Sequence, residues 1–315
     1  MGTDRKVCSR CRRCESFFYR PYSGEVLCKK CFLGTIEGKV RATIGKYKMF
    51  SFNDRIAVAV SGGKDSLSLL QILSKIEKKH STASLVAIIV DEGIRGYRDE
   101  AIEIATNACK KLDIEHQVTY FKKLYGVTLE EIVERMRQTP KTRLSPCAYC
   151  GVLRRRALNV AALKVGANKI ATGHTLDDET QTILLNIFHG DVPGIAREKP
   201  VTEVVHPRLV QRVKPFCEIP ERETALYAYV KKIKFQSVPC PYSSEALRND
   251  MRLMLNRVEE KHPGTKFTVF RSIEKIRSAL EVFGKKEGFK ECRECGEPAS
   301  LDLCKTCQML KQVNS

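Results

Sequence analysis

Short apolar runs alternate with segments of helical periodicity through the middle of the chain. Residues 55–60 contain the unbroken run Ile-Ala-Val-Ala-Val, which predicts a buried parallel strand, and residues 67–73 repeat leucine and isoleucine at helical spacing. Further strands are predicted at residues 85–90, 115–120 and 169–172, and further helices at residues 101–112, 128–138 and 177–188. This alternation predicts an α/β fold with a doubly wound parallel sheet, whose ligand site lies at the carboxyl ends of the strands.

The pattern becomes helical after Pro220. Helices are predicted at residues 221–232 and 246–260, and a helix rich in lysine and arginine at residues 272–283. Cysteine-rich segments flank both the α/β core and this helical region. We therefore expect four parts: a cysteine module with a linker helix at 1–50, the α/β domain at 51–220, a smaller helical region at 221–290 and a second cysteine module at 291–315.

The composition is that of a globular protein. Of 315 residues, 43% are hydrophobic and 29% are charged, and no stretch approaches the roughly 18 consecutive apolar residues of a membrane-spanning helix. The first 13 residues are basic and cysteine-bearing with no apolar segment behind them, which is untypical of a secretory signal or a transit peptide. We expect a soluble, cytoplasmic protein with no membrane partner.

Positive charge dominates the chain. Lysine and arginine number 55 against 37 acidic residues, a difference of +18, and a field of this sign favours polyanions. Nucleic acid is the expected partner, and the simpler alternative is a basic surface that only keeps the protein soluble. Tryptophan is absent and aromatic residues make up 7%, so charge and shape would contribute more to recognition than base stacking.

A glycine-containing loop follows the first buried strand. In Ser61-Gly62-Gly63-Lys64-Asp65-Ser66 the glycines let the backbone approach an anion, the next helix points its amide groups at that anion, and Lys64 adds a full charge. The loop is shorter than a mononucleotide-binding P-loop, and a simple glycine-containing turn is the alternative. The segment resembles the PP-loop of N-type ATP pyrophosphatases, which cleave ATP between the α and β phosphates and pass AMP to a substrate oxygen.

A second strand-to-helix junction carries Gly-His-Thr-Leu-Asp-Asp-Glu at residues 173–179. Its polar residues could simply cap the helix. In the resembled family this motif lies beside ATP, which implies that Gly173 approaches the nucleotide and that Asp178 is catalytic. Asp91 and Gly93, at the end of the second strand, are placed to frame the adenosine. The resemblance implies the following nucleotide-binding residues: Val60, Ser61, Gly62, Gly63, Lys64, Asp65, Ser66, Val90, Gly173 and Asp178.

Fourteen cysteines in a chain without a secretory signal favour metal or redox ligands over disulfides. Cys147 and Cys150 form a Cys-x-x-Cys pair just before a helix predicted at residues 152–165, whose N-terminus and arginines would stabilise thiolates. The pair alone fits a reactive dithiol, half of a zinc site or a structural pair. Cys240, held between two prolines, supplies a potential third ligand.

Several segments together resemble the TtuA-type tRNA 2-thiouridine synthetases and their archaeal and eukaryotic relatives, the cytoplasmic tRNA 2-thiolation proteins. The resemblance spans nearly the whole chain and rests on residues 91–98, 147–151, 173–179 and 213–215. It implies a 4Fe-4S cluster held by Cys147, Cys150 and Cys240, with one iron left without a protein ligand, where sulfide could bind. The alternative is a persulfide on Cys147 or Cys150 that Cys240 resolves.

One residue departs from the TtuA-type pattern. Arg154 stands four places after Cys150, where TtuA-type members have lysine. Arginine keeps the charge and can bind phosphate through two nitrogens, but it does not readily give up a proton. We therefore assign Arg154 to phosphate or transition-state charge and not to acid–base catalysis.

Cysteines at both ends of the chain have the spacing of zinc ligands. Cys292, Cys295, Cys304 and Cys307 form a four-thiolate signature across a small hairpin. Near the start, Cys28 and Cys31 pair either with Cys8 and Cys11 or with Cys11 and Cys14. The resemblance favours the set Cys8, Cys11, Cys28 and Cys31, because relatives have the same spacing between the knuckles. We expect two structural zinc ions, since four thiolates leave zinc no open position.

The resemblance implies an ATP-dependent reaction on tRNA. ATP with Mg²⁺ would adenylate the C2 oxygen of a uridine, and sulfur would then replace AMP to leave 2-thiouridine. Lys64 and the loop amides would stabilise phosphate charge, and Asp65 and Asp178 would assist magnesium or proton handling. The three central cysteines would deliver the sulfur.

The wobble uridine is the expected target. Residues 92–99 and 151–155, and a cysteine in place of histidine at Cys31, look more like the wobble branch of the family than the T-loop branch. The alternatives are T-loop ribothymidine thiolation, another PP-loop modification of tRNA, or a zinc-ribbon RNA-binding scaffold with an inert loop. The family resemblance suggests a ubiquitin-like thiocarboxylate protein or free sulfide as the sulfur donor, and a homodimer is expected.

Overall fold

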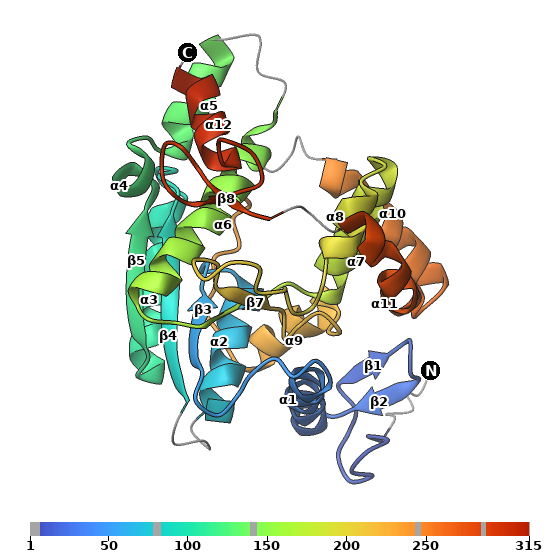
Figure 1. Ribbon diagram of the computed structural model, residues 1–315. Helices are drawn as coiled ribbons and strands as arrows, with labels where there is room; N and C mark the ends of the chain where they lie inside the picture. Colours follow the sequence, from blue (N-terminus) through green and yellow to red (C-terminus); the bar gives the residue numbers. More distant parts are fainter. Residues whose placement is uncertain (1–6, 78–82, 139–143, 243–246, 285–287, 315) are drawn as a thin grey trace.

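A parallel sheet lies at the centre of the computed structural model, which describes residues 7–77, 83–138, 144–242, 247–284 and 288–314. Within these residues the sheet has five strands in the order β5-β4-β3-β6-β7, all paired in parallel. The strands are β3 (Arg55–Ala59), β4 (Ser84–Asp91), β5 (Glu115–Tyr120), β6 (Lys169–Ala171) and β7 (Gln211–Val213). Helices surround the sheet (Figure 1). The predicted doubly wound parallel sheet is confirmed.

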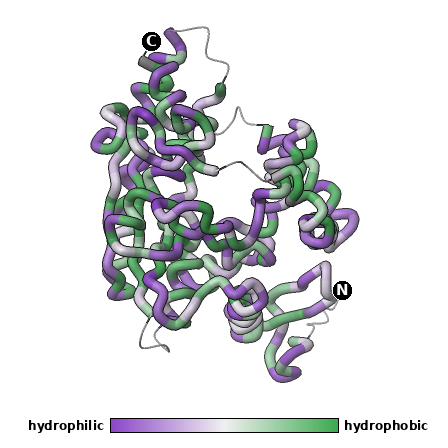
Figure 2. The backbone as a smooth tube through the Cα atoms, in the orientation of Figure 1, coloured by the Kyte–Doolittle hydropathy of each residue, from purple (hydrophilic) through white to green (hydrophobic). Residues whose placement is uncertain are grey.

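Strand side chains point alternately to two hydrophobic clusters, one on each face of the sheet. Val58 belongs to the cluster that contains residues of α2 (Lys64–Glu77) and α3 (Arg98–Leu112), whereas its neighbour Ala57 belongs to the cluster that contains residues of α5 (Leu129–Gln138) and α6 (Pro146–Lys164). In Figure 2 hydrophobic residues concentrate along the central strands, and hydrophilic residues recur along the surrounding helices. Because both faces are covered, the strands form continuous apolar runs.

The strand order reverses at β3, which has β4 on one side and β6 on the other. Ligands of open α/β sheets bind in the crevice at such a switch point, beyond the carboxyl ends of the strands. The loop after β3 and the motif after β6 meet there: a Cβ on Gly173 would lie 3.0 Å from the backbone nitrogen of Ser66. Gly173 is therefore needed for close packing against the start of α2.

The remaining elements form two cysteine modules and a helical layer. The N-terminal module has β1 (Phe18–Arg20), β2 (Glu25–Leu27) and α1 (Lys29–Lys46), and the C-terminal module has β8 (Lys290–Glu291), β9 (Pro298–Ala299) and α12 (Lys305–Asn314). The other helices are α4 (Phe121–Tyr125), α7 (Leu176–Phe188), α8 (Val192–Arg197), α9 (Glu221–Val230), α10 (Leu247–Lys261) and α11 (Thr265–Gly284). The two modules lie at opposite ends of the molecule in Figure 1.

These outer elements pack against different parts of the core. Helix α9 packs on α1 and α2, α11 packs on α7 and α8, and α12 packs on α5 and α6. The N-terminal module is thereby connected to the helix of the glycine loop, and the C-terminal module to the helix of the central cysteines. Among the described residues, none of the helices has both the length and the hydropathy of a membrane-spanning segment.

Two helices begin well before their predicted first residues. Helix α6 begins at Pro146 and not at residue 152, because the Ser145 hydroxyl accepts a hydrogen bond from the Ala148 amide and proline is favoured in a first turn. Cys147 and Cys150 are consequently helical. Helix α11 begins at Thr265, before the predicted start at residue 272. Strand β7 was not predicted, since its sequence Gln-Arg-Val has only one apolar residue.

Gly62→Ala should destabilise the protein. Gly62 has φ +89°, and a Cβ there would lie 2.5 Å from the carbonyl oxygen of Ala101 in α3. We expect the left-handed backbone to cost about 1–2 kcal/mol and the overlap about 1–3 kcal/mol more in the free energy of unfolding, measured with urea. The control is Gly126→Ala, at φ +73° with nothing within 4 Å. Equal effects of the two substitutions would show that α3 does not press on the loop.

Candidate active site

The glycine loop after β3 is folded around its own hydroxyl groups. The Ser61 amide donates to the Ser66 hydroxyl at 3.1 Å, and the Gly63 amide donates to the Ser61 hydroxyl at 3.3 Å. Gly62 turns the chain through a positive φ, and α2 begins at Lys64. The loop therefore presents its backbone and the positive end of α2 at the carboxyl edge of the sheet, as an anion site requires.

Lys64 is held by carboxylates beside this loop. Its ammonium lies 2.6 Å from Glu221 and 2.9 Å from Asp65, and Asp65 also accepts a hydrogen bond from Thr224 of α9. Burial alone would lower the pKa of Lys64, but the two carboxylates raise it above its ordinary value. Burial raises the pKa of Asp65, and Lys64 opposes that shift. Lys64 is thus a fixed cation that can exchange its carboxylate partners for phosphate oxygens.

The motif at residues 173–179 has a structural role that the sequence left open. Thr175 is the N-cap of α7, and the Asp178 carboxylate accepts from the Thr175 amide at 2.9 Å, which completes a capping box. Asp177 is buried and accepts from the Glu221 amide at 2.7 Å, so it caps α9. Asp178 is one-third exposed and lies 3.7 Å from Arg248, and its catalytic role stays a prediction.

Asp91 and Gly93 lie at the end of β4, as predicted. The Asp91 carboxylate accepts from the Gly93 amide at 2.8 Å, and Gly93 has a positive φ next to Thr128. Both residues line an open cavity of about 790 Å³ that Tyr242 also lines. The strand end that was expected to frame the adenosine therefore opens toward the segment that carries Cys240.

The structure brings the three central cysteines to the N-terminus of α6. The Cys147 thiol donates to the Tyr242 carbonyl oxygen at 3.3 Å, and Cys240 packs against the hydrophobic cluster that contains Cys150. Burial raises the pKa of Cys150, while the guanidinium of Arg154, 2.9 Å from its sulfur, opposes this shift. Residues from two distant segments thus converge beside one helix terminus and one arginine.

This cysteine set fits an iron–sulfur cluster better than a single zinc ion. Among the described residues, the groups whose ligand atoms all lie within 4.8 Å of one another are the two terminal cysteine sets, and the three central cysteines do not form such a group. Three thiolates are also one fewer than a closed zinc site needs. A larger cluster spans wider sulfur positions, and the helix terminus and Arg154 would offset its negative charge.

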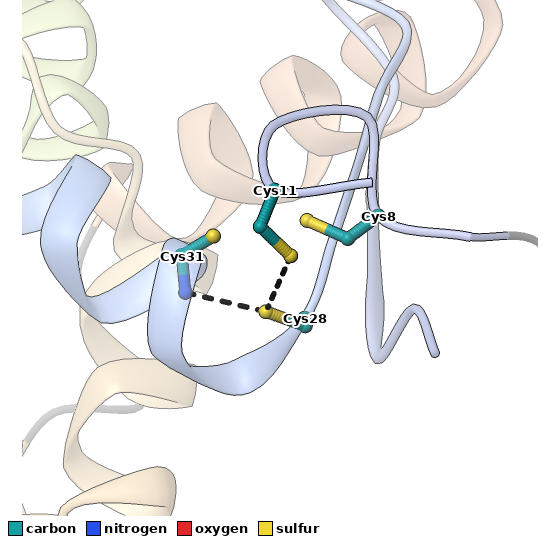
Figure 3. Close-up of side chains that lie close together, drawn as sticks. All are labelled: Cys8, Cys11, Cys28 and Cys31. Atoms are coloured by element: carbon teal, nitrogen blue, oxygen red, sulfur yellow. Dashed lines mark hydrogen bonds between the residues drawn. The ribbon is translucent and has the colours of Figure 1, made fainter. Parts of the chain in front are cut away.

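The N-terminal cysteines form a compact four-sulfur group. Cys8, Cys11, Cys28 and Cys31 have their sulfurs within 4.8 Å of one another and point toward a common centre (Figure 3). Backbone amides, that of Cys11 above all, lower the pKa of Cys8 to about 6, which favours the thiolate that metals bind. Cys14 is exposed and lies outside this group, so the geometry favours the set that includes Cys8.

The C-terminal group lies against the helix of the central cysteines. Its members, within 4.8 Å of one another, are Cys292, Cys295, Cys304 and Cys307. Arg156 of α6 lies 3.8 Å from the Cys304 sulfur and 4.0 Å from the Cys307 sulfur, where its charge would balance zinc-bound thiolates. Tyr149 of α6 also contacts Gln312 of α12 at 3.4 Å. Sequence spacing predicted the four ligands but not this attachment to α6.

A partly buried ion-pair chain between the loop and the cysteines was not predicted from the sequence. Glu92 is 4% exposed and lies 2.7 Å from the Arg98 guanidinium and 2.9 Å from that of Arg154. Arg98 in turn donates to the Ser61 carbonyl oxygen at 2.9 Å. Glu92 and Arg98 lie in the charged segment after the second predicted strand, but periodicity does not reveal that they are buried.

Fold and loop together define the class of protein. The family model described as PP-loop domain matches residues 35–259, more than half of the chain. The matched region contains the parallel sheet, the glycine loop at its switch point and the central cysteines. The chain is a member of the PP-loop ATP pyrophosphatase superfamily.

Three relatives define its branch. "Probable sulfurtransferase" of Methanocaldococcus jannaschii is 39% identical over 94% of this chain and 85% of its own. "Cytoplasmic tRNA 2-thiolation protein 1" of Chlamydomonas reinhardtii is 37% identical over 98% of this chain and 85% of its own. The solved U34-tRNA thiolase NcsA from Methanococcus maripaludis, with its 4Fe-4S cluster, matches at a TM-score of 0.84 and 34% identity, over 97% of this chain and 96% of its own. The chain belongs to this family of tRNA 2-thiolation proteins.

Zinc content should follow the two four-cysteine groups. We expect about two zinc ions per chain in the wild type, and about one in Cys8→Ser or Cys307→Ser, because each group needs all four thiolates to close. Cys14→Ser is the matched control and should keep both. Inductively coupled plasma mass spectrometry measures the zinc content per chain, with iron determined separately. Loss of one zinc ion in Cys14→Ser but not in Cys8→Ser would place Cys14 in the site.

Proposed function

We propose that the chain is an ATP-dependent tRNA-uridine 2-sulfurtransferase that acts on the wobble uridine through the residues described above. The observation that carries this proposal is the contact between the PP-loop and the cysteine segment. Gln236 lies four residues before Cys240, and its backbone amide donates a hydrogen bond to the Gly62 carbonyl oxygen at 3.0 Å. An adenylating loop and a sulfur-handling centre therefore share one crevice.

The substrate follows from charge and family. A net charge of +18 suits a polyanion, and the names of the relatives specify tRNA 2-thiolation, with U34 as the target of the solved thiolase. The chain thiolates tRNA as these relatives do. The relatives' name also gives the cytoplasm as the compartment, in agreement with the expectation from sequence.

In the first half-reaction the C2 oxygen of uridine attacks the α phosphorus of ATP. The bond from that phosphorus to the bridging oxygen breaks, and pyrophosphate leaves with the electron pair. In this proposal Lys64, the loop amides and the N-terminus of α2 stabilise the phosphate charge, and Asp65 and Asp178 assist magnesium or proton handling. The N3 proton of uridine is released, and the product is a uridine whose C2 carbon carries an AMP leaving group.

In the second half-reaction sulfur at the level of hydrosulfide forms a bond to C2. The C2–O bond breaks, and AMP leaves with its electron pair and the former uridine oxygen. When bound by Cys147, Cys150 and Cys240, a 4Fe-4S cluster supplies an iron without a protein ligand at which sulfur can be held. Arg154 lies 2.9 Å from the Cys150 sulfur and is 46% exposed, and in this proposal it stabilises the charge that develops on the leaving phosphate.

The proposal also covers the zinc ions, the sulfur donor, the oligomeric state and the domain division. Two structural zinc ions bind the terminal cysteine groups. The sulfur donor is a ubiquitin-like thiocarboxylate protein or free sulfide, and the working unit is a homodimer, both proposed from the family resemblance. The division at residues 50, 220 and 290 likewise stays a prediction, with the third cluster cysteine in a helical tRNA-binding region.

Cys240→Ala should abolish thiolation. We expect loss of 2-thiouridine formation by at least about 100-fold, with loss of cluster iron, because two cysteines leave the cluster without its third protein ligand. The assay is anaerobic, with unmodified tRNA, ATP and sulfide, followed by nucleoside mass spectrometry and iron analysis. Cys14→Ala is the control and should keep both properties.

Oligonucleotide fragments of the same tRNA, analysed by mass spectrometry, locate the modified base. Thiolation at the wobble position supports the proposed target, whereas thiolation in the T-loop with an unmodified wobble uridine would reverse it. Full thiolation by Cys240→Ala under anaerobic conditions would contradict the role of the three cysteines. Absence of tRNA-dependent pyrophosphate release from the wild type would instead support an RNA-binding scaffold with an inert loop.

A further inference from the structure

A buried carboxylate connects the two halves of the site. Glu92 follows β4 directly, is 4% exposed, and has its carbonyl oxygen fixed by the Leu129 amide at 2.7 Å. One carboxylate oxygen lies 2.7 Å from Arg98 and the other 2.9 Å from Arg154. A buried charge is costly unless it is paired, and here one carboxylate pairs with two guanidinium groups.

Arg98 is anchored on the nucleotide side. It is 5% exposed and donates to the carbonyl oxygens of Ser61 in the PP-loop and Val90 at the end of β4. These two backbone segments are the ones expected to bind ATP. Without Glu92, Arg98 would still be held by the two carbonyl oxygens.

Arg154 depends more strongly on Glu92. It rises from α6 with a half-exposed side chain, and its described contacts are Glu92 and the Cys150 sulfur. A long side chain at the edge of the crevice can adopt many rotamers, so a charged partner in the protein interior is needed to fix its direction. Loss of the Glu92 charge would therefore leave the Arg154 side chain free to change rotamer, while the PP-loop keeps its own hydrogen bonds.

The pairs form an unbroken path from the Ser61 carbonyl through Arg98, Glu92 and Arg154 to the Cys150 sulfur. We propose that Glu92 is a positioning residue that holds Arg154 at a fixed place between the PP-loop and the cysteine centre, so that sulfur and not water reaches the adenylated uridine. This inference rests on the proposed function. Attack by water at C2 would return uridine and AMP, so a misplaced Arg154 consumes ATP without thiolation.

Glu92→Gln tests the inference through the ratio of pyrophosphate released to 2-thiouridine formed. The cluster-reconstituted full chain is assayed with tRNA, ATP and sulfide. We expect the ratio to rise about tenfold in the variant, in the range found for residues that orient catalytic groups. The dissociation constant for ATP should change less than about twofold, because Arg98 keeps its carbonyl partners.

The matched control is Glu115→Gln. Glu115 makes the same kind of ion pair, with Arg55 at 2.9 Å, but that pair is on the surface, with Glu115 65% exposed, and neither residue lines the cavity at the end of β4. This variant should keep the wild-type ratio. If Glu92→Gln does not fold, Glu92→Asp decides the question, because it keeps the charge but its shorter side chain cannot reach both arginines; it too should raise the ratio.

A double-mutant cycle separates positioning from general structural support. If Glu92 acts through Arg154, adding Glu92→Gln to Arg154→Gln should not raise the ratio further. The same cycle, measured as urea unfolding of the cluster-free chain, should give effects that do not add. Additive effects in both measurements would overturn the inference.

The experiment distinguishes failure of the proposed function from failure of the inference about Glu92. A wild type that releases pyrophosphate but forms no 2-thiouridine contradicts the proposed function. The inference alone is contradicted if the wild type forms 2-thiouridine and the ratio of pyrophosphate to 2-thiouridine is unchanged in Glu92→Gln, or in Glu92→Asp where that variant is needed.

Discussion

Close backbone packing at the switch point of the sheet is the constraint on which the site depends. Gly62 and Gly173 have no side chain where α3 and the start of α2 approach within 3 Å of the position a Cβ would occupy. The loop after β3, the motif after β6 and the end of β4 can therefore converge at one edge. The cysteine segment joins them through the bond from the Gln236 amide to the Gly62 carbonyl oxygen.

Ion pairs between distant segments extend this arrangement through the molecule. The first turn of α9 holds Lys64 through Glu221, and Glu223 two residues later pairs with the fully buried Arg20 of the N-terminal module at 2.8 Å. On the opposite side, Arg156 joins the C-terminal cysteine group to α6. Each terminal module is thus connected to one half of the candidate site, the N-terminal one to the PP-loop and the C-terminal one to the helix of Cys147 and Cys150.

Local patterns predicted the elements and ligands that depend on neighbours in sequence. Strand patterns predicted β3, β4 and β5, loop chemistry predicted the PP-loop, and cysteine spacing predicted the C-terminal group. At the N-terminus spacing left two cysteine sets open, and the family resemblance favoured the one with Cys8. The start of α6 was misplaced because Ser145 and Pro146 begin the helix before its apolar periodicity does. The pairing of Glu92 with Arg98 and Arg154 was not predictable, because it depends on which of many charged residues the fold buries together.

The central claim is that ATP activates the uridine C2 oxygen, which sulfur then replaces. Isotope tracing tests it most directly: tRNA carrying ¹⁸O at C2 of the wobble uridine is thiolated by the reconstituted protein, and the nucleotides are analysed by mass spectrometry. The label should appear in AMP, one atom for each 2-thiouridine formed, because the C–O bond breaks with oxygen on the AMP side. Label retained in the tRNA or released into water, with unlabelled AMP, would contradict the claim.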